Sequence, residues 1–128
     1  MAGAILMQDW ITVRGSALTT IVKQPEDQYP DLSMYQDIVV IQEVSDLTGG
    51  TSATTQMTYE TAPAKDDVLF DKIDATAQFI MALGVTRVVL RYSAVSLPIS
   101  RYVRWKLTGG TGTPPWSVTF RVWLSPNL

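Results

Sequence analysis

The strongest constraint in this sequence is a strict two-residue alternation of apolar and polar side chains near its C-terminus. Between Trp116 and Leu124, an apolar residue occupies every second position, and the segment 102–107 alternates in the same way. A period of two places alternate side chains on opposite faces of a β-strand. The pattern therefore predicts two half-buried strands. We expect them to pair as a hairpin across the Gly- and Pro-rich segment Thr108–Pro115.

Weaker strand signals occur in the middle of the chain. The segments 53–60 and 87–92 alternate, whereas Ile38–Val44 has apolar residues on both parities. A run of the second kind is typical of a central strand that is covered on both faces. The segment Thr48–Thr51, with two glycines, is predicted to be a short hairpin loop that leads into the next strand.

The N-terminal third and one central segment are less regular. Ile5–Val13 and Ala17–Lys23 are strand candidates, Pro25–Pro30 has the composition of a loop, and Asp67–Ala82 fits either short strands or a helical turn. No long amphipathic helix is indicated. About eight strands at this spacing predict an all-β fold, a two-sheet antiparallel β-sandwich for which a jelly roll is one possible arrangement. The 128 residues suit a single domain spanning 1–128.

Two missing residue types restrict the chemistry available to the chain. It contains no Cys and no His, which excludes disulfides, thiolate nucleophiles and the commonest general base and metal ligand. The densest carboxylates could in principle form a glycosidase pair or a calcium site, but lysines stand beside them, and a solvated acidic loop is the prediction. We therefore expect no enzyme, no catalytic residue, no metal and no cofactor. The acidic residues in question are Asp66, Asp67, Asp71 and Asp74.

Charge is divided unequally along the chain. The first 86 residues hold all 12 acidic and four basic side chains, and the remainder holds six basic side chains and no acid. The favoured interpretation is that strands from the two halves pair and neutralise each other. The alternative is one acidic and one basic face, through which copies of the chain could meet. Six dispersed basic residues do not predict binding to nucleic acid.

No targeting or membrane segment is predicted. Met1–Met7 carries no basic side chain, and its apolar run is too short for a signal peptide. No apolar stretch reaches the ~20 residues that a membrane span requires.

The tryptophans fall into two groups. Trp105 and Trp116 lie on the parity predicted to be buried, whereas Trp123 lies on the opposite parity, two residues after Arg121. An outward aromatic next to Arg has the composition of an interface anchor, unless another segment of the chain covers it. An exposed Trp could also stack on a sugar ring. Trp10 is a candidate for either the core or an interface.

Three segments carry a family resemblance. They are Tyr59–Asp67 followed by Phe70, the "RYVR" strand Arg101–Arg104, and the Thr108–Pro115 turn with its aromatic last strand. Together they resemble small β-sandwich structural proteins of tailed bacteriophages. "RYVR" is also similar to a strand of discoidin-type sandwiches, but the Cys pair common in those domains is absent here.

The phage resemblance implies a component of the virion, either a head-decoration or capsid-stabilising protein or one associated with the tail. Its partners would be capsid or tail proteins and copies of itself, and residues 1–35, which lie largely outside the resemblance, would include an N-terminal arm. We expect interface residues on exposed strand faces, and the alternative function is a carbohydrate-binding module that uses exposed aromatics. The predicted interface residues are Trp123, Arg121, Arg104, Lys106 and Trp10.

Overall fold

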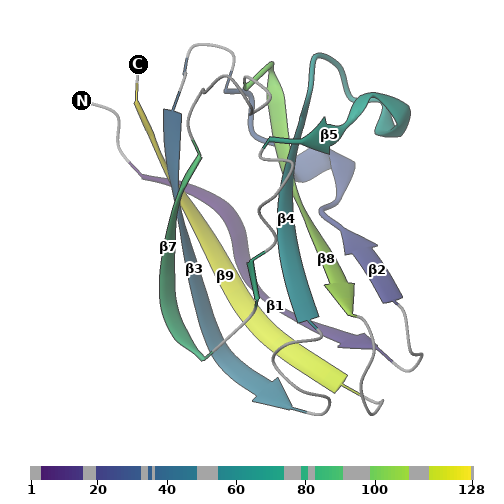
Figure 1. Ribbon diagram of the computed structural model, residues 1–128, viewed down its shortest axis with the longest axis vertical. Coiled ribbons are helices and arrows are strands. Elements are labelled where there is room, and N and C mark those ends of the chain that lie inside the picture. Colours follow the sequence, from purple (N-terminus) through teal and green to yellow (C-terminus); the bar gives the residue numbers. More distant parts are fainter. Residues whose placement is uncertain are drawn as a thin grey trace.

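The computed structural model shows two antiparallel sheets packed face to face (Figure 1). It describes residues 4–15, 20–32, 35, 37–48, 55–73, 79–80, 83–90, 99–109 and 116–127. The first sheet has the strand order β1-β9-β3-β7, and the second has the order β2-β8-β4-β5, with β6 also paired to β4. The strands are β1 (Ile5–Gly15), β2 (Thr20–Lys23), β3 (Asp37–Thr48), β4 (Thr55–Ala62), β5 (Asp71–Lys72), β6 (Phe79–Ile80), β7 (Gly84–Leu90), β8 (Tyr102–Gly109) and β9 (Trp116–Asn127). Two short 3-10 helices, η1 (Glu26–Gln28) and η3 (Asp67–Leu69), complete the described elements.

The order of the strands is that of a jelly roll. Successive strands lie in opposite sheets, except for β4, β5 and β6, which stay in the second sheet. Apart from the pairing of β4 with β5 and β6, the strands therefore pair with strands distant in the sequence, and β1 pairs with β9. A double sheet built in this way is the jelly-roll architecture. The prediction of a two-sheet antiparallel β-sandwich is confirmed, in the jelly-roll form that the sequence allowed.

Both predicted hairpins were wrong. β8 pairs with β4 and β2, β9 pairs with β1 and β3, and β3 and β4 lie in different sheets. Alternation determines which face a side chain occupies, but it carries no information about the neighbouring strand. The connections expected to be hairpin loops instead cross from one sheet to the other. Residues 49–54 and 110–115 of these connections lie outside the described residues.

The less regular segments also take defined places. Residues 5–15 and 20–23 are strands of the two sheets, so they lie within the sandwich and do not form a separate arm. The segment Asp67–Ala82 contains both of the alternatives predicted for it, a 3-10 turn in η3 and the short strands β5 and β6. Among the described residues, no helix is long and apolar enough to cross a membrane.

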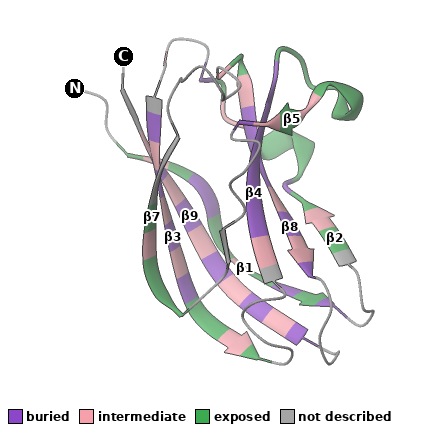
Figure 2. Ribbon diagram, viewed as in Figure 1, coloured by how far each residue is buried: buried purple, intermediate pink, exposed green. Residues whose placement is uncertain are grey.

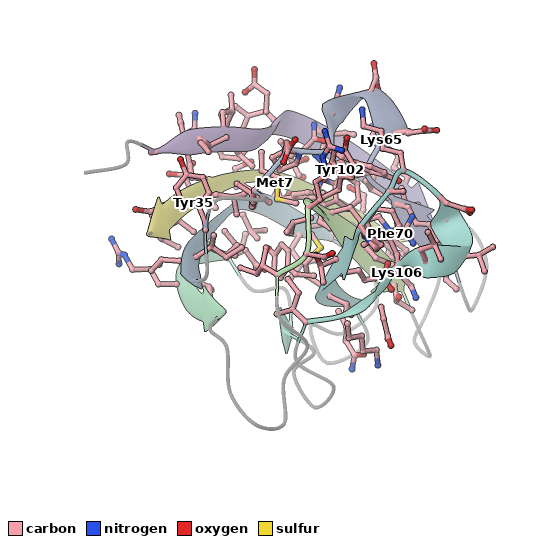
Figure 3. The ribbon with its side chains drawn as sticks, turned by 90° about the horizontal axis from the view of Figure 1, so that it is seen from above. Met7, Tyr35, Lys65, Phe70, Tyr102 and Lys106 are labelled. Carbon is pink, nitrogen blue, oxygen red and sulfur yellow. The ribbon has the colours of Figure 1, made fainter. Side chains whose placement is uncertain are left out.

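The core lies between the sheets, and Trp105 is its largest fully buried side chain. The Trp105 indole packs edge-on against Phe120 of the opposite sheet, with ring centroids 5.1 Å apart. Trp116 is also buried, so the prediction for both tryptophans is confirmed. Figure 3 shows Met7 among the side chains between the sheets. The other core residues are Val13, Leu32, Ile38, Val40, Val44, Met57, Tyr59, Ile73, Val103, Leu107, Val118, Val122 and Leu124.

Three buried glutamines add directional bonds to this apolar core. Trp105 Nε1 donates to Gln8 Oε1 at 3.3 Å, and the Tyr59 hydroxyl donates to Gln42 Oε1, so each bond joins the two sheets. The Gln24 amide donates to the Met7 carbonyl at 2.9 Å and accepts from the Trp105 backbone N–H. Because a buried polar group is costly without its partner, these bonds specify how the sheets face each other.

Trp116 fills a slot between two glycines at one end of the sandwich. Gly15 is its register partner on β1, and Gly109 is the last residue of β8 in the other sheet. A Cβ added to either glycine would overlap the Trp116 indole. The two sheets can therefore close on this ring only because both positions lack a side chain.

We expect Gly109→Ala to lower the free energy of unfolding by about 1–3 kcal/mol, because the added methyl group overpacks the Trp116 slot. Urea unfolding of the purified chain measures the change. In a Trp116→Leu background the same substitution should cost less, because the smaller side chain leaves room. Equal losses of unfolding free energy in both backgrounds would contradict the tight packing of Trp116 against Gly109.

We expect stability at alkaline pH to depend on Tyr59. Burial raises the pKa of the Tyr59 hydroxyl well above its ordinary value of 10.0. The folded state therefore holds this proton more tightly than the unfolded chain, and its stabilising effect is lost as pH rises above about 10. Unfolding free energies measured between pH 8 and 11 should fall less steeply for Tyr59→Phe than for the unmodified chain. Parallel slopes would contradict the prediction.

Candidate interaction surface

The outer face of the first sheet carries an aromatic and charged cluster centred on Arg121. Arg121 points outward from β9, and its register partner on β3 is Glu43. The Arg121 Nη2 atom lies 2.5 Å from a Glu43 carboxylate oxygen. The Arg121 guanidinium carbon lies 5.3 Å from the ring centroid of Trp123, which follows on the same face of β9. Trp123 therefore points away from the core, as its parity predicts.

A β-bulge in β1 brings Trp10 to the same cluster. Gln8 pairs with Val122 and Ile11 pairs with Phe120, so two residues of β1, Asp9 and Trp10, stand opposite Arg121 alone. The Trp10 ring centroid lies 4.6 Å from the Arg121 guanidinium carbon, and Trp10 is 45% exposed. A guanidinium in contact with two indoles is held by cation–π attraction. We call Trp10, Arg121, Trp123 and Glu43 the tryptophan–arginine cluster.

Apolar side chains extend this cluster across all four strands of the first sheet. Leu6 on β1 is 42% exposed and Val85 on β7 is 55% exposed. Val39 and Ile41 on β3 are half-buried, on the parity opposite the core residues Ile38 and Val40. Figure 2 shows intermediate and exposed positions alternating with buried ones along β1, β3 and β9, whereas the described positions of β7 are exposed or intermediate. The described part of the chain thus leaves an apolar strip in contact with solvent.

Three of the five predicted interface residues meet here, namely Trp10, Arg121 and Trp123. The sequence reasoning did not select Glu43, Ile41, Leu6 or Val85. A signal for Ile41 was present, because Ile38–Val44 is apolar on both parities. That pattern was interpreted as a strand covered on both faces, whereas the described structure covers only the inner face fully.

The other two predicted residues, Arg104 and Lys106, lie on β8 in the second sheet, away from the cluster. The prediction that Arg104 lies on an exposed strand face was wrong, because only 3% of its side chain is exposed. Its parity does point out of the sandwich, but residues of the segments around η1 and η3 cover it. The Lys106 side chain remains 26% exposed.

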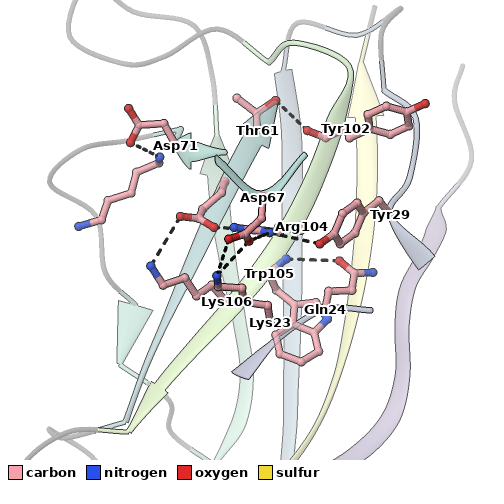
Figure 4. Close-up of polar contacts among 12 residues, drawn as sticks. Lys23, Gln24, Tyr29, Thr61, Asp67, Asp71, Tyr102, Arg104, Trp105 and Lys106 are labelled. Carbon is pink, nitrogen blue, oxygen red and sulfur yellow. Dashed lines mark hydrogen bonds and ion pairs between the residues drawn. The ribbon is translucent and has the colours of Figure 1, made fainter. Parts of the chain in front are cut away.

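Arg104 joins four segments of the chain (Figure 4). Its Nε donates to Glu60 on β4 at 2.9 Å, and its Nη1 donates to the Tyr29 hydroxyl at 3.2 Å and to Asp67 Oδ1 at 2.7 Å. The Phe70 ring covers the guanidinium at 3.9 Å from its centroid. Figure 3 shows Phe70 and Lys106 near each other on this side of the sandwich. The loops that follow β2 and β4 are thereby fixed to the second sheet.

The pKa values of Asp67 and Arg104 are both shifted in the direction that favours the charged form of the side chain. Burial lowers the pKa of Arg104, but hydrogen bonds to Tyr29, Asp67 and Glu60 outweigh that effect and leave the pKa above its ordinary value. Hydrogen bonds from Lys23 and Arg104 lower the pKa of Asp67. The carboxylate and the guanidinium therefore both stay charged across the ordinary pH range.

The unequal charge along the sequence is resolved by pairing between the halves. Glu43 lies opposite Arg121, and Glu60 lies opposite Arg104, at registered positions of adjacent strands. Arg101 also bonds to Asp31. The favoured interpretation, cross-strand neutralisation, is confirmed for these pairs.

The described acidic residues of the segment, Asp66, Asp67 and Asp71, are exposed to solvent as predicted, and Asp66 and Asp67 also bond within the chain. Asp66 caps η3 by accepting from the Val68 N–H, and Asp67 bonds to Lys23 and Arg104. Among the described residues, no group of acidic side chains could hold a metal ion. Asp74 lies outside the described residues.

Comparisons with known proteins identify no family. No family model and no curated protein matches the sequence. Among solved structures, the chain aligns with a chain from a structure of infectious bursal disease virus, Gx strain, with a TM-score of 0.47 and 12% identity. The alignment covers 97% of this chain and 30% of the viral chain. An overlap at this score does not establish a shared function.

We expect Arg104→Leu to lower the free energy of unfolding by about 3–5 kcal/mol, because it leaves Glu60 buried without its main partner. The matched control is Arg101→Leu, which removes an ion pair between two exposed side chains and should lower the free energy of unfolding far less, because solvent screens the pair. Adding Glu60→Leu to Arg104→Leu should restore part of the loss. Equal losses of unfolding free energy for the two arginine variants, measured by urea unfolding, would contradict the role of Arg104 as the main partner of the buried Glu60.

Proposed function

We propose that this protein is a non-enzymatic structural component of a tailed-phage virion, acting through protein–protein contacts at the head or the tail. The observation that carries the proposal is the tryptophan–arginine cluster on the open outer face of the first sheet. Trp and Arg are enriched among the residues that dominate binding energy at protein interfaces. Here two tryptophans and an arginine are held together on a rigid sheet, so little conformational entropy would be lost on binding.

The architecture supports the same proposal by analogy. Jelly rolls are found in viral capsid domains and in lectin domains, although a fold alone does not determine function. Two of the three sequence segments that resemble phage proteins also lie together. Ala62 pairs with Tyr102, and Asp67 bonds to Arg104, so both segments belong to one structural unit of the second sheet. That unit stabilises the domain, which leaves the first sheet to contact partners.

A carbohydrate-binding function is the second candidate, and Trp10 is the observation that favours it. Its indole is nearly half exposed and contacts the Arg121 guanidinium, and its backbone N–H donates to the Asp9 carboxylate. Stacking on an aromatic ring with hydrogen bonds from neighbouring charged groups is a common way to hold a sugar.

The test is to purify virions from the source and to count this chain against the major shell protein by quantitative mass spectrometry. A fixed stoichiometry to the shell protein is expected for a capsid or decoration role, and a few copies per particle for a tail role. Absence from the particles would overturn the virion proposal. A glycan array then examines the second candidate, for which Trp10→Ala and Trp123→Ala should abolish any binding.

A further inference from the structure

We infer that the outer face of the first sheet pairs two copies of this chain face to face, across a two-fold axis parallel to the strands. The inference rests on the proposed function, because it names a partner for the same surface. The face has a suitable size. Four strands spaced by about 4.8 Å and 7–12 residues long make a face roughly 19 Å wide and 24–40 Å long. That is comparable with the ~800 Å² that each partner contributes to a standard interface.

The side chains on this face are arranged in an order that matters for pairing. From one edge to the other the strands are β1, β9, β3 and β7. β1 presents Leu6, Trp10, the acidic Asp9 and, further along the strand, the basic Arg14, and β7 presents Val85 and the basic Arg87, all of them exposed. Between these edges, β9 presents Arg121 and Trp123, and β3 presents Glu43 and Ile41. The two central strands thus carry opposite charges at the same level, because β9 contains no acidic residue and β3 contains no basic one.

A two-fold axis parallel to the strands matches these halves. Such a rotation places β1 of one copy over β7 of the other and β9 over β3. Arg121 then faces Glu43 of the second copy, and Trp123 faces its Ile41. At the edges, Trp10 and Asp9 come level with Val85 of the second copy, and Leu6 comes level with its Arg87, which lies two residues along β7 from Val85 and within reach of Asp9. Every contact occurs twice, as an isologous interface requires.

The alternative two-fold axis, perpendicular to the strands in the same plane, does not produce this match. It places each strand over its own copy, so that Arg121 meets β9, which has no acidic side chain, Glu43 meets β3, which has no basic one, and the basic β7 edges meet each other. Juxtaposed like charges disfavour that arrangement. The outer face of the second sheet is also unsuited to such stacking, because the loops with η1 and η3 are fixed over it through Arg104 and Asp67.

Sedimentation velocity of the full chain over a wide concentration range tests whether the dimer forms through this face. We expect a concentration-dependent dimer. Trp10→Glu should raise the dissociation constant of the dimer at least about tenfold, because it places a charge in the contact. The matched control is Val68→Glu, which introduces the same charge at a position that is 86% exposed on η3, over the second sheet. The control should leave dimerisation unchanged. A chain that stays monomeric, or equal effects of the two variants, would overturn the inference.

Charge reversal tests the direction of the axis. Asp9→Arg removes the acidic partner of Arg87 and makes both edges basic, and Arg87→Asp places an acidic side chain near Asp9 of the second copy, so each variant alone should dimerise more weakly than the unmodified chain. An equimolar mixture of the two should form a heterodimer, because each edge then meets the opposite charge. Within one chain, β1 and β7 are separated by two strands, about 14 Å, so the recovery must arise between copies.

No recovery in the mixture would overturn the parallel axis. This failure is distinct from a failure of the proposed function, which is decided by counting the chain in virions. A chain that is present in virions but monomeric in solution refutes only the pairing of copies.

Discussion

The fold depends on the contacts of one side chain, the buried Trp105. Its ring packs against Phe120 in the opposite sheet, its indole N–H bonds to Gln8 on β1, and its backbone bonds to Gln24 after β2. In a jelly roll, neighbouring strands are distant in the sequence, so short loops do little to determine which strands meet. A large residue that combines apolar area with a single directed donor can fix both the spacing and the relative position of two sheets.

The two outer faces of the sandwich differ in how far loops cover them. On the second sheet, polar side chains on β4 and β8 are covered by loops, and the ion pairs of Arg104 compensate for the desolvation. On the first sheet, the described chain adds no such cover, and apolar and aromatic side chains remain half-exposed. An arginine appears in both places with opposite consequences. Arg104 binds the chain to itself, whereas Arg121 holds two indoles in position at the surface.

Much of this arrangement was predictable from alternation. The strands at 102–107 and 116–124 and the inward or outward direction of Trp105, Trp116 and Trp123 follow from a period of two. Sheet partners did not follow, because most strands pair with strands far along the chain. The burial of Arg104 was missed because its cover comes from polar loops that have no apolar pattern of their own. Whether Trp10 lies in the core or on the surface could not be predicted, because a bulge interrupts the alternation of β1 at that point.

The position of β9 has a consequence for how the protein is made. This last strand lies between β1 and β3, and it is the only described strand that pairs with β1. During translation, the first sheet therefore lacks its centre until residues 116–127 have left the ribosome, long after β1 has emerged. Such non-local pairing makes folding slow. It also means that a chain truncated before β9 cannot present Trp10 beside Arg121.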